Sequence, residues 1–238
     1  MGKNLIQQAR GKGGPRYRAP SFRYIGDVTH KNLSEKAVDG KIVDFVKCPG
    51  HSAPLAKVVY SDKEAVLMLA AEGLKVGDTV SCGRGAEIKA GNIIPLSDIP
   101  EGTLVYNIEN SPGDGGKFCR ASGTFARVLS KFTDKVVVEL PSKKQKAFQN
   151  NCRASIGIIA GGGRTEKPFL KAGNKYYAMR ARNKLWPIVC GQSMNAVDHP
   201  HGGSRSSKKN YPYTVSRNAP PGAKVGAIAA KRTGRKKR

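Results

Sequence analysis

Short β-rich runs occupy the middle of the chain, and Val38–Val46 alternates imperfectly between apolar and polar residues, with a Gly that suggests a β-bulge. Gly, Pro and Asp residues separate the runs. The first group comprises Val38–Val46, Leu55–Tyr60, Ala65–Leu69, Thr79–Cys82, Ala86–Ile94 with a break at Gly91, and Thr103–Ile108. The second follows Ser111–Gly116 and comprises Gly123–Leu129, Lys135–Leu140, a short link at Lys143–Phe148, and Arg153–Ala160. This spacing predicts a mainly β protein with two small barrels in tandem.

The two ends of the chain lack such patterns. Met1–Tyr24 and Gln192–Arg238 together contain only 7 of the 50 Leu, Ile, Val and Phe residues. Ends this poor in apolar residues cannot bury a core, so we expect them to stay disordered until a partner orders them. Gly and Pro also disfavour helices and central strands in Arg10–Tyr24. The only helix that we expect lies at Pro168–Asn183, where Pro168 suits a first helical turn.

Positive charge points to a polyanionic partner. Lys and Arg number 42 against 17 Asp and Glu, which gives a formal net charge of +25. Met1–Tyr24 has six basic residues and no acid, and Gln192–Arg238 has eleven basic residues and one acid. Self-repulsion of this size favours binding to a polyanion. We therefore expect the partner to be a nucleic acid, with an anionic membrane surface as a distant second. The two barrel-like modules are more typical of an RNA-binding protein than of a DNA-packaging protein.

Several other classes are disfavoured. The longest apolar stretch, Ala65–Ala71, is far shorter than the ~18 residues of a membrane span, and Met1–Arg18 has no apolar region of a secretory signal. We therefore expect no membrane partner and a cytoplasmic location. The five Cys residues stand 33 to 38 positions apart, which argues against disulfides and against paired zinc ligands. We expect single buried cysteines at strand positions and no metal.

Basic residues alternate with aromatic residues near the N-terminus. Tyr17, Phe22 and Tyr24 stand among Arg and Lys, so cations can neutralise phosphates while rings stack on unpaired bases. The alternative is a solvated arm without a role. At the other end, the basic cluster Lys231–Arg238 fits either nucleic-acid binding or nuclear localisation.

The densest polar cluster is Asp198–Gly203, which reads Asp-His-Pro-His-Gly-Gly. A hydrolase would pair Asp198 with a histidine and use Ser193 or Ser204 as nucleophile, and a metalloenzyme would bind its metal through both imidazoles. Sequence neighbours rarely converge into a triad, and this loop is glycine-rich and basic. RNA contact fits better, because the glycines let the backbone approach a ligand that the imidazoles contact. A simple surface turn is the remaining interpretation.

Several motifs resemble those of the universal large-subunit ribosomal protein L-two family, in its archaeal and eukaryotic branch. Met194–Gly203 resembles the family signature, and Ser111–Thr124 is similar to the stretch that joins the family's two barrels. Further similar segments are Arg10–Arg18, Val138–Ser142, Cys152–Gly157 and Leu170–Asn174. Ala196, Cys190 and Ser204 stand where Pro, Arg and Gly are common in the family.

The resemblance implies an architecture and a function. It implies a basic N-terminal extension (residues 1–35), an OB-like barrel (36–108), an SH3-like barrel with a short helix (109–187) and a basic C-terminal extension (188–238). It implies a structural constituent of the large ribosomal subunit, not an enzyme, that binds large-subunit rRNA. It would support subunit assembly, subunit association, tRNA binding and the peptidyl-transferase region. Its partners would be that rRNA, neighbouring ribosomal proteins and the small subunit at the intersubunit face, without a cofactor or small-molecule substrate.

The residues expected to contact rRNA are cations, an aromatic residue of the basic ends, and residues of Met194–Gly203, which we call the signature loop. They are Arg10, Lys12, Arg16, Tyr17, Arg18, Arg23, Arg120, Arg153, Arg164, Asn195, Asp198, His199, His201, Gly202, Gly203, Arg205, Lys208, Lys209, Arg217, Lys231, Arg232 and Arg235. No catalytic or metal-binding residue is expected. The alternative is a hydrolase or metalloenzyme centred on Asp198, His199 and His201.

Overall fold

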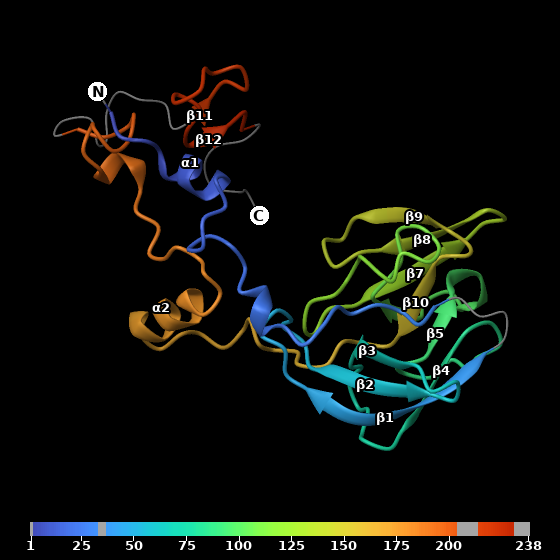
Figure 1. The fold of residues 1–238 in the computed structure, drawn as a ribbon. Coiled ribbons are helices and arrows are strands. Elements are labelled where there is room, and N and C mark those ends of the chain that lie inside the picture. The colour runs from blue at the N-terminus through green and yellow to red at the C-terminus, as the bar shows by residue number, and fades with distance from the viewer. Residues whose placement is uncertain (1, 33–36, 204–213, 231–238) are drawn as a thin grey trace. The chain divides into compact units, whose positions relative to one another are not determined.

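The computed structural model describes residues 2–32, 37–203 and 214–230, and the chain divides into two compact units (Figure 1). Ser21–Pro168 forms the first, which we call the sheet unit. Met1–Pro20 and Phe169–Arg238 form the second, which we call the terminal unit. Most of the described residues of the two basic ends therefore belong to one unit, whereas Arg23 and Tyr24 belong to the other. The domain boundaries expected at residues 35, 108 and 187 stay predictions.

Ten strands of the sheet unit form one sheet in the order β3-β2-β1-β4-β5-β10-β6-β7-β8-β9. They are β1 (Val38–Val46), β2 (Leu55–Tyr60), β3 (Ala65–Leu69), β4 (Thr79–Cys82), β5 (Ile93–Pro95), β6 (Leu104–Tyr106), β7 (Ala126–Lys131), β8 (Lys135–Glu139), β9 (Gln145–Gln149) and β10 (Arg153–Ile156). The prediction of a mainly β protein is confirmed. Within the described residues, the order begins at β3 and ends at β9 without a closing pair.

Strand β10 joins the two groups of strands that the sequence pattern distinguishes. It pairs with β5 on one side and with β6 on the other, so Ser155 stands opposite both Ile93 and Tyr106. Successive side chains of a strand point to opposite faces. Accordingly, Ile93 packs in a core with residues of β1 to β4, whereas its neighbour Ile94 packs in a second core with residues of β6 to β10. One continuous sheet thus contributes to both of these cores, and a third core joins Leu55 of β2 and Leu69 of β3 to Tyr106 of β6.

Some strand bounds differ from the predicted ones. Strands β1 to β4 have the predicted bounds. Most of Ala86–Ile94 is not strand, because Gly91 adopts a left-handed conformation (φ 92°) that turns the chain just before β5. The expected link at Lys143–Phe148 instead contains most of β9, which pairs with β8 over five positions.

The terminal unit contains α1 (Ile6–Gly11), α2 (Ala172–Arg180) and the parallel pair β11 (Thr214–Val215) and β12 (Ala227–Ile228). Helix α2 lies within the predicted helical segment. Helix α1 was not predicted from the sequence. It can form because the glycines that disfavour a helix begin only at its last residue, Gly11. In the described part of the chain there are also three 3-10 turns, at Ser21–Arg23, Leu96–Asp98 and Gly191–Ser193.

Burial within the terminal unit is sparse. Among its described residues only Pro20, His201 and Val225 are buried. This agrees with the scarcity of apolar residues at the chain ends. No helix in the described part of the chain is long and apolar enough to cross a membrane.

The cysteines only partly match their expected placement. Cys48, Cys82 and Cys152 are buried, Cys119 is half-buried and Cys190 is exposed. Only Cys82 lies in a strand. The predicted burial is therefore confirmed for Cys48, Cys82 and Cys152 and wrong for Cys119 and Cys190. The predicted strand position is confirmed for Cys82 alone, because loops next to strands also enclose small side chains.

Candidate nucleic-acid interface

The signature loop is a compact turn closed by its own backbone. The N–H groups of Asp198 and His199 donate to the carbonyl oxygen of Asn195 at 2.9 and 3.2 Å, and the Gly202 N–H donates to that of His199 at 2.9 Å. A Cβ at Gly202 would lie 2.3 Å from the Asn195 carbonyl oxygen. Gly202 is therefore required by the packing of the loop itself, whatever ligand approaches it.

The two histidines of the loop contact each other. Their ring centroids are 5.1 Å apart, and the backbone N–H of His201 donates to Nδ1 of His199 at 3.0 Å. An Nδ1 atom that accepts a hydrogen bond carries no proton, so this geometry favours neutral His199. Burial, with a smaller contribution from His201, lowers the pKa of His199 and acts in the same direction.

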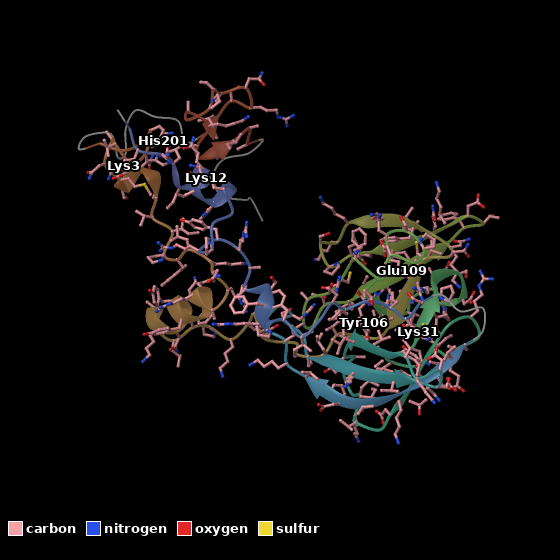
Figure 2. All side chains as sticks on the ribbon, in the orientation of Figure 1. Lys3, Lys12, Lys31, Tyr106, Glu109 and His201 are labelled. Atoms are coloured by element: carbon pink, nitrogen blue, oxygen red, sulfur yellow. The ribbon has the colours of Figure 1, made fainter. Side chains whose placement is uncertain are left out.

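The acidic residue of the loop turns to the N-terminal segment. Asp198 Oδ1 lies 3.2 Å from Nζ of Lys3, and the Lys3 N–H donates to the Val197 carbonyl oxygen at 2.8 Å. Figure 2 labels Lys3 and His201 in this unit. A hydrolase would need the carboxylate on the imidazole. Among the described residues, no group of three or more His, Cys, Asp or Glu could hold a metal ion. The observed contacts are those of a structured loop that packs against the N-terminal segment.

The expected contact residues differ in exposure. Exposed residues are Arg10, Lys12, Arg16, Arg18, Arg23, Arg164, Asn195 and Arg217. Half-buried residues are Tyr17, Arg120, Asp198, His199, Gly202 and Gly203, and His201 is buried. Arg205, Lys208, Lys209, Lys231, Arg232 and Arg235 lie outside the described residues. The cluster Lys231–Arg238 also lies outside them.

The prediction that Arg153 contacts rRNA is wrong, because the side chain of Arg153 is buried. It is only 3% exposed. Its Nε and Nη2 donate to Oε1 of Glu109 at 3.1 and 2.7 Å, and its Nη1 donates to the carbonyl oxygen of Lys31 at 2.6 Å. A guanidinium with these partners is not available to phosphate. Arg153 is therefore a structural residue of the sheet unit.

Glu109, labelled in Figure 2, accepts most of the hydrogen bonds of this buried network. It is fully buried and also accepts backbone N–H groups from Arg153, Gly113 and Gly115, at 2.9, 3.2 and 3.4 Å. Burial by itself would raise the pKa of Glu109, but the hydrogen bonds and charge of Arg153 outweigh it and hold this pKa below its usual value. The carboxylate is therefore charged and fully used inside the fold.

The network fastens residues 28–31 to the sheet unit. His30 Nε2 lies 2.6 Å from the carbonyl oxygen of Asn107, and burial lowers the pKa of His30 to about 4. Nη2 of Arg120 donates to the Val28 carbonyl oxygen at 2.9 Å. Lys31 is buried and forms ion pairs with Asp62 and Glu64. Arg120 and Lys31 thus stabilise the packing of residues 28–31 against the strands.

Sequence reasoning missed one group of cations and aromatic residues. Arg16, Tyr176, Arg180, Lys184 and Trp186 line a common cavity in the terminal unit, and only Arg16 was expected at an interface. The signal was present, because the segment from Lys175 to Trp186 interleaves basic and aromatic residues as the N-terminal segment does.

Comparison with known proteins identifies the family. A family model described as "Ribosomal Proteins L2, RNA binding N-terminal domain" matches residues 2–82, and "Ribosomal Proteins L2, C-terminal domain" matches residues 89–224. The chain belongs to the ribosomal protein L2 family. This confirms the membership expected from the signature Met194–Gly203.

Relatives in this family are similar over their whole length. The chain is 52% identical to a protein of Methanothermobacter thermautotrophicus, with all of both chains covered. It is 54% identical to one of Archaeoglobus fulgidus, with 98% of this chain and 99% of the relative covered. It is 53% identical to one of Halorubrum lacusprofundi, with 99% and 98% covered. Each is named "Large ribosomal subunit protein uL2".

Proposed function

We propose that this chain is a structural constituent of the large ribosomal subunit and that it binds large-subunit rRNA. The observation that carries the proposal is the match of residues 2–82 to the RNA-binding domain of the family. The net charge of +25 and the coreless terminal unit support it, because exposed cations supply affinity for phosphates. In this role the protein is not an enzyme, needs no cofactor or small-molecule substrate, and resides on cytoplasmic ribosomes.

The finer architecture belongs to the same proposal. Residues 36–108 would form an OB-like barrel and residues 109–187 an SH3-like barrel, between basic extensions at 1–35 and 188–238. The division of Ile93 and Ile94 between two apolar cores supports two modules, and a third core, which includes Leu55, Leu69 and Tyr106, joins them. Subunit assembly, subunit association, tRNA binding and support of the peptidyl-transferase region are roles of the same proposal. Its partners would include neighbouring ribosomal proteins and the small subunit.

The rRNA contacts proposed here are those expected from sequence, except Arg153. Exposed cations such as Arg10, Lys12 and Arg18 neutralise phosphates, and Tyr17 offers a ring for stacking. The signature loop presents Asn195 as an exposed polar side chain.

A salt titration tests the proposal. Binding of the full chain to a large-subunit rRNA fragment is measured at increasing salt, beside an unrelated RNA of equal length. The triple variant Arg10→Gln, Lys12→Gln, Arg18→Gln should bind more weakly and reduce the slope of log K against log salt by about 2–3, since each phosphate contact contributes roughly 0.7–0.9.

The matched control removes three exposed lysines of the sheet unit. They are Lys135, Lys143 and Lys144, which lie outside the matched RNA-binding domain. Their change to Gln should alter the slope much less. Equal slopes for both triple variants, or equal affinity of the unmodified chain for both RNAs, would contradict the proposed function.

A further inference from the structure

A cavity in the terminal unit combines cationic and aromatic side chains. It has a volume of about 370 Å³ and is lined by Arg16, Tyr176, Arg180, Asn183, Lys184, Leu185 and Trp186. Three of these residues are cations, two are aromatic and none is acidic. Its volume lies near the lower end of the ~300–1,000 Å³ range of small-ligand pockets, so it suits one small group and not a duplex.

The end of helix α2 builds one side of the cavity. Asn183 adopts a left-handed conformation (φ 50°), its N–H donates to the Arg180 carbonyl oxygen at 3.0 Å, and the Lys184 N–H donates to that of Met179 at 3.0 Å. This pair of bonds is the Schellman motif, which reverses the chain after a helix. The reversal returns Trp186 to the helix, where Nζ of Lys175 lies 5.5 Å from the centroid of its ring.

The N-terminal segment supplies the opposing cation. The side-chain amide of Asn183 donates to the carbonyl oxygens of Pro15 and Arg18 at 3.3 and 3.0 Å. The N–H of Tyr17 donates to the Gly14 carbonyl oxygen at 2.9 Å, which closes a turn around Arg16. One asparagine therefore ends the helix and also fastens the segment that carries Arg16 beside it.

We propose that this cavity binds one unstacked nucleotide of an RNA strand. The base stacks on the indole of Trp186, with Tyr176 beside it, and Arg16, Arg180 and Lys184 bind the adjoining phosphates. Aromatic faces attract unpaired bases, and guanidinium groups bind phosphate oxygens in pairs. This inference rests on the proposed function, that the chain binds RNA, and adds a site and a ligand conformation to it.

The other anionic ligands match the lining less well. A free phosphate would use the three cations but leave both aromatic side chains without a role. Stacked duplex RNA offers phosphates but no free base face. An unpaired nucleotide uses both kinds of side chain at once.

Trp186 is the only tryptophan of the chain, so its fluorescence reports on this cavity alone. The probes are single-stranded hexa-adenylate and an abasic ribose-phosphate hexamer with the same number of phosphates. Both are titrated into the full, unmodified chain. Hexa-adenylate should quench the emission in a saturable manner, and the abasic hexamer should bind without comparable quenching.

Two pairs of neighbouring residues provide matched variants. Tyr176→Leu removes the ring beside the stacked base and should weaken hexa-adenylate binding about 5-fold, the lower end of the effect of losing a stacking ring. Tyr177→Leu removes an exposed ring that does not line the cavity and should have a much smaller effect. Arg180→Gln should weaken binding about tenfold, and Arg182→Gln, with the same loss of charge, should weaken it less.

The outcomes separate this inference from the proposed function. Equal quenching by both hexamers, or equal losses within each matched pair, would overturn the nucleotide site. Equally strong quenching by a tyrosine-containing hexaglutamate peptide would overturn it in favour of a protein partner. Absent quenching with salt-dependent binding of the large-subunit rRNA fragment would overturn the inference alone. Failure of that fragment to bind would overturn both.

Discussion

Replacing the buried carboxylate of Glu109 by an amide should destabilise the sheet unit strongly. Glu109→Gln keeps the shape of the side chain but removes the charge that compensates Arg153. It also places an NH₂ group where two oxygens now accept five N–H donors. Removing one partner of a buried ion pair costs about 3–5 kcal/mol, because the other charge stays buried and uncompensated.

That cost corresponds to a measurable shift in melting temperature. For a unit of nearly 150 residues, 1 kcal/mol changes Tm by about 2–4 °C. Thermal unfolding of the full chain, followed by circular dichroism, should therefore show a Tm lower by roughly 6–20 °C. Glu72→Gln, at an exposed position of the same unit, is the control and should shift Tm little.

Hydrogen exchange gives a second readout of the same change. The His30 N–H donates to the carbonyl oxygen of Gly115 at 3.2 Å, within the segment that the Glu109 network fastens. This amide should exchange faster in Glu109→Gln. A Tm within about 2 °C of the unmodified chain, which is less than 1 kcal/mol, would refute the view that the charged carboxylate holds this network together.

Three further changes have definite expected outcomes. The pKa of His30 falls to about 4 on folding, so only the unfolded chain takes up this proton between pH 6.5 and 4. As the pH is lowered over that interval, the free energy of unfolding should fall by up to about 3 kcal/mol, measured by urea titration. The fall should be smaller in His30→Asn. Gly191→Ala places a Cβ 2.2 Å from the His199 ring, which must move and lose its hydrogen bond, so filter binding should show about 2- to 10-fold weaker rRNA affinity with unchanged Tm. Gly173→Ala meets no atom within 4 Å and should slow amide exchange in α2 about two- to fivefold, whereas unchanged exchange would contradict its helical propensity.

Strands were predictable where apolar runs are bounded by turn residues. Strands β1 to β4 are such runs, and their bounds follow from the sequence; β1 alternates imperfectly, with a bulge between Ile42 and Asp44, and β3 is apolar throughout. Strand β9 was taken for a link because Gln145–Gln149 contains one buried apolar residue, Phe148. Lys146 lies on the same face of β9 as Phe148 and is half-buried, with its Nζ 4.0 Å from the centroid of the Phe118 ring. A cation thus occupies a position where alternation in a strand predicts an apolar residue.

The sequence predicted which kinds of residue form the RNA-binding site, but not every residue that belongs to it. The signature loop and the basic ends are visible in the sequence because their residues are neighbours. Arg153 looks like any other phosphate-binding arginine, and its true partner, Glu109, stands 44 positions away. The nucleotide cavity joins Arg16 to Trp186 through the hydrogen bonds of Asn183. Sequence patterns show which charges exist, whereas tertiary contacts decide which of them face solvent.

The composition of the terminal unit has a consequence for synthesis. Residues 1–20 leave the ribosome before the sheet unit, whereas their partners Asn183 and Val197 come after it. At about 5–20 residues per second, the nearly 150 intervening residues take roughly 7–30 s to translate. During this delay the nascent chain displays an acid-free cationic segment without its intramolecular contacts. Early binding of an acidic chaperone or of RNA would shield this segment. Because residues 1–20 are translated before the segments that contact them, they need such a partner earlier than the rest of the terminal unit.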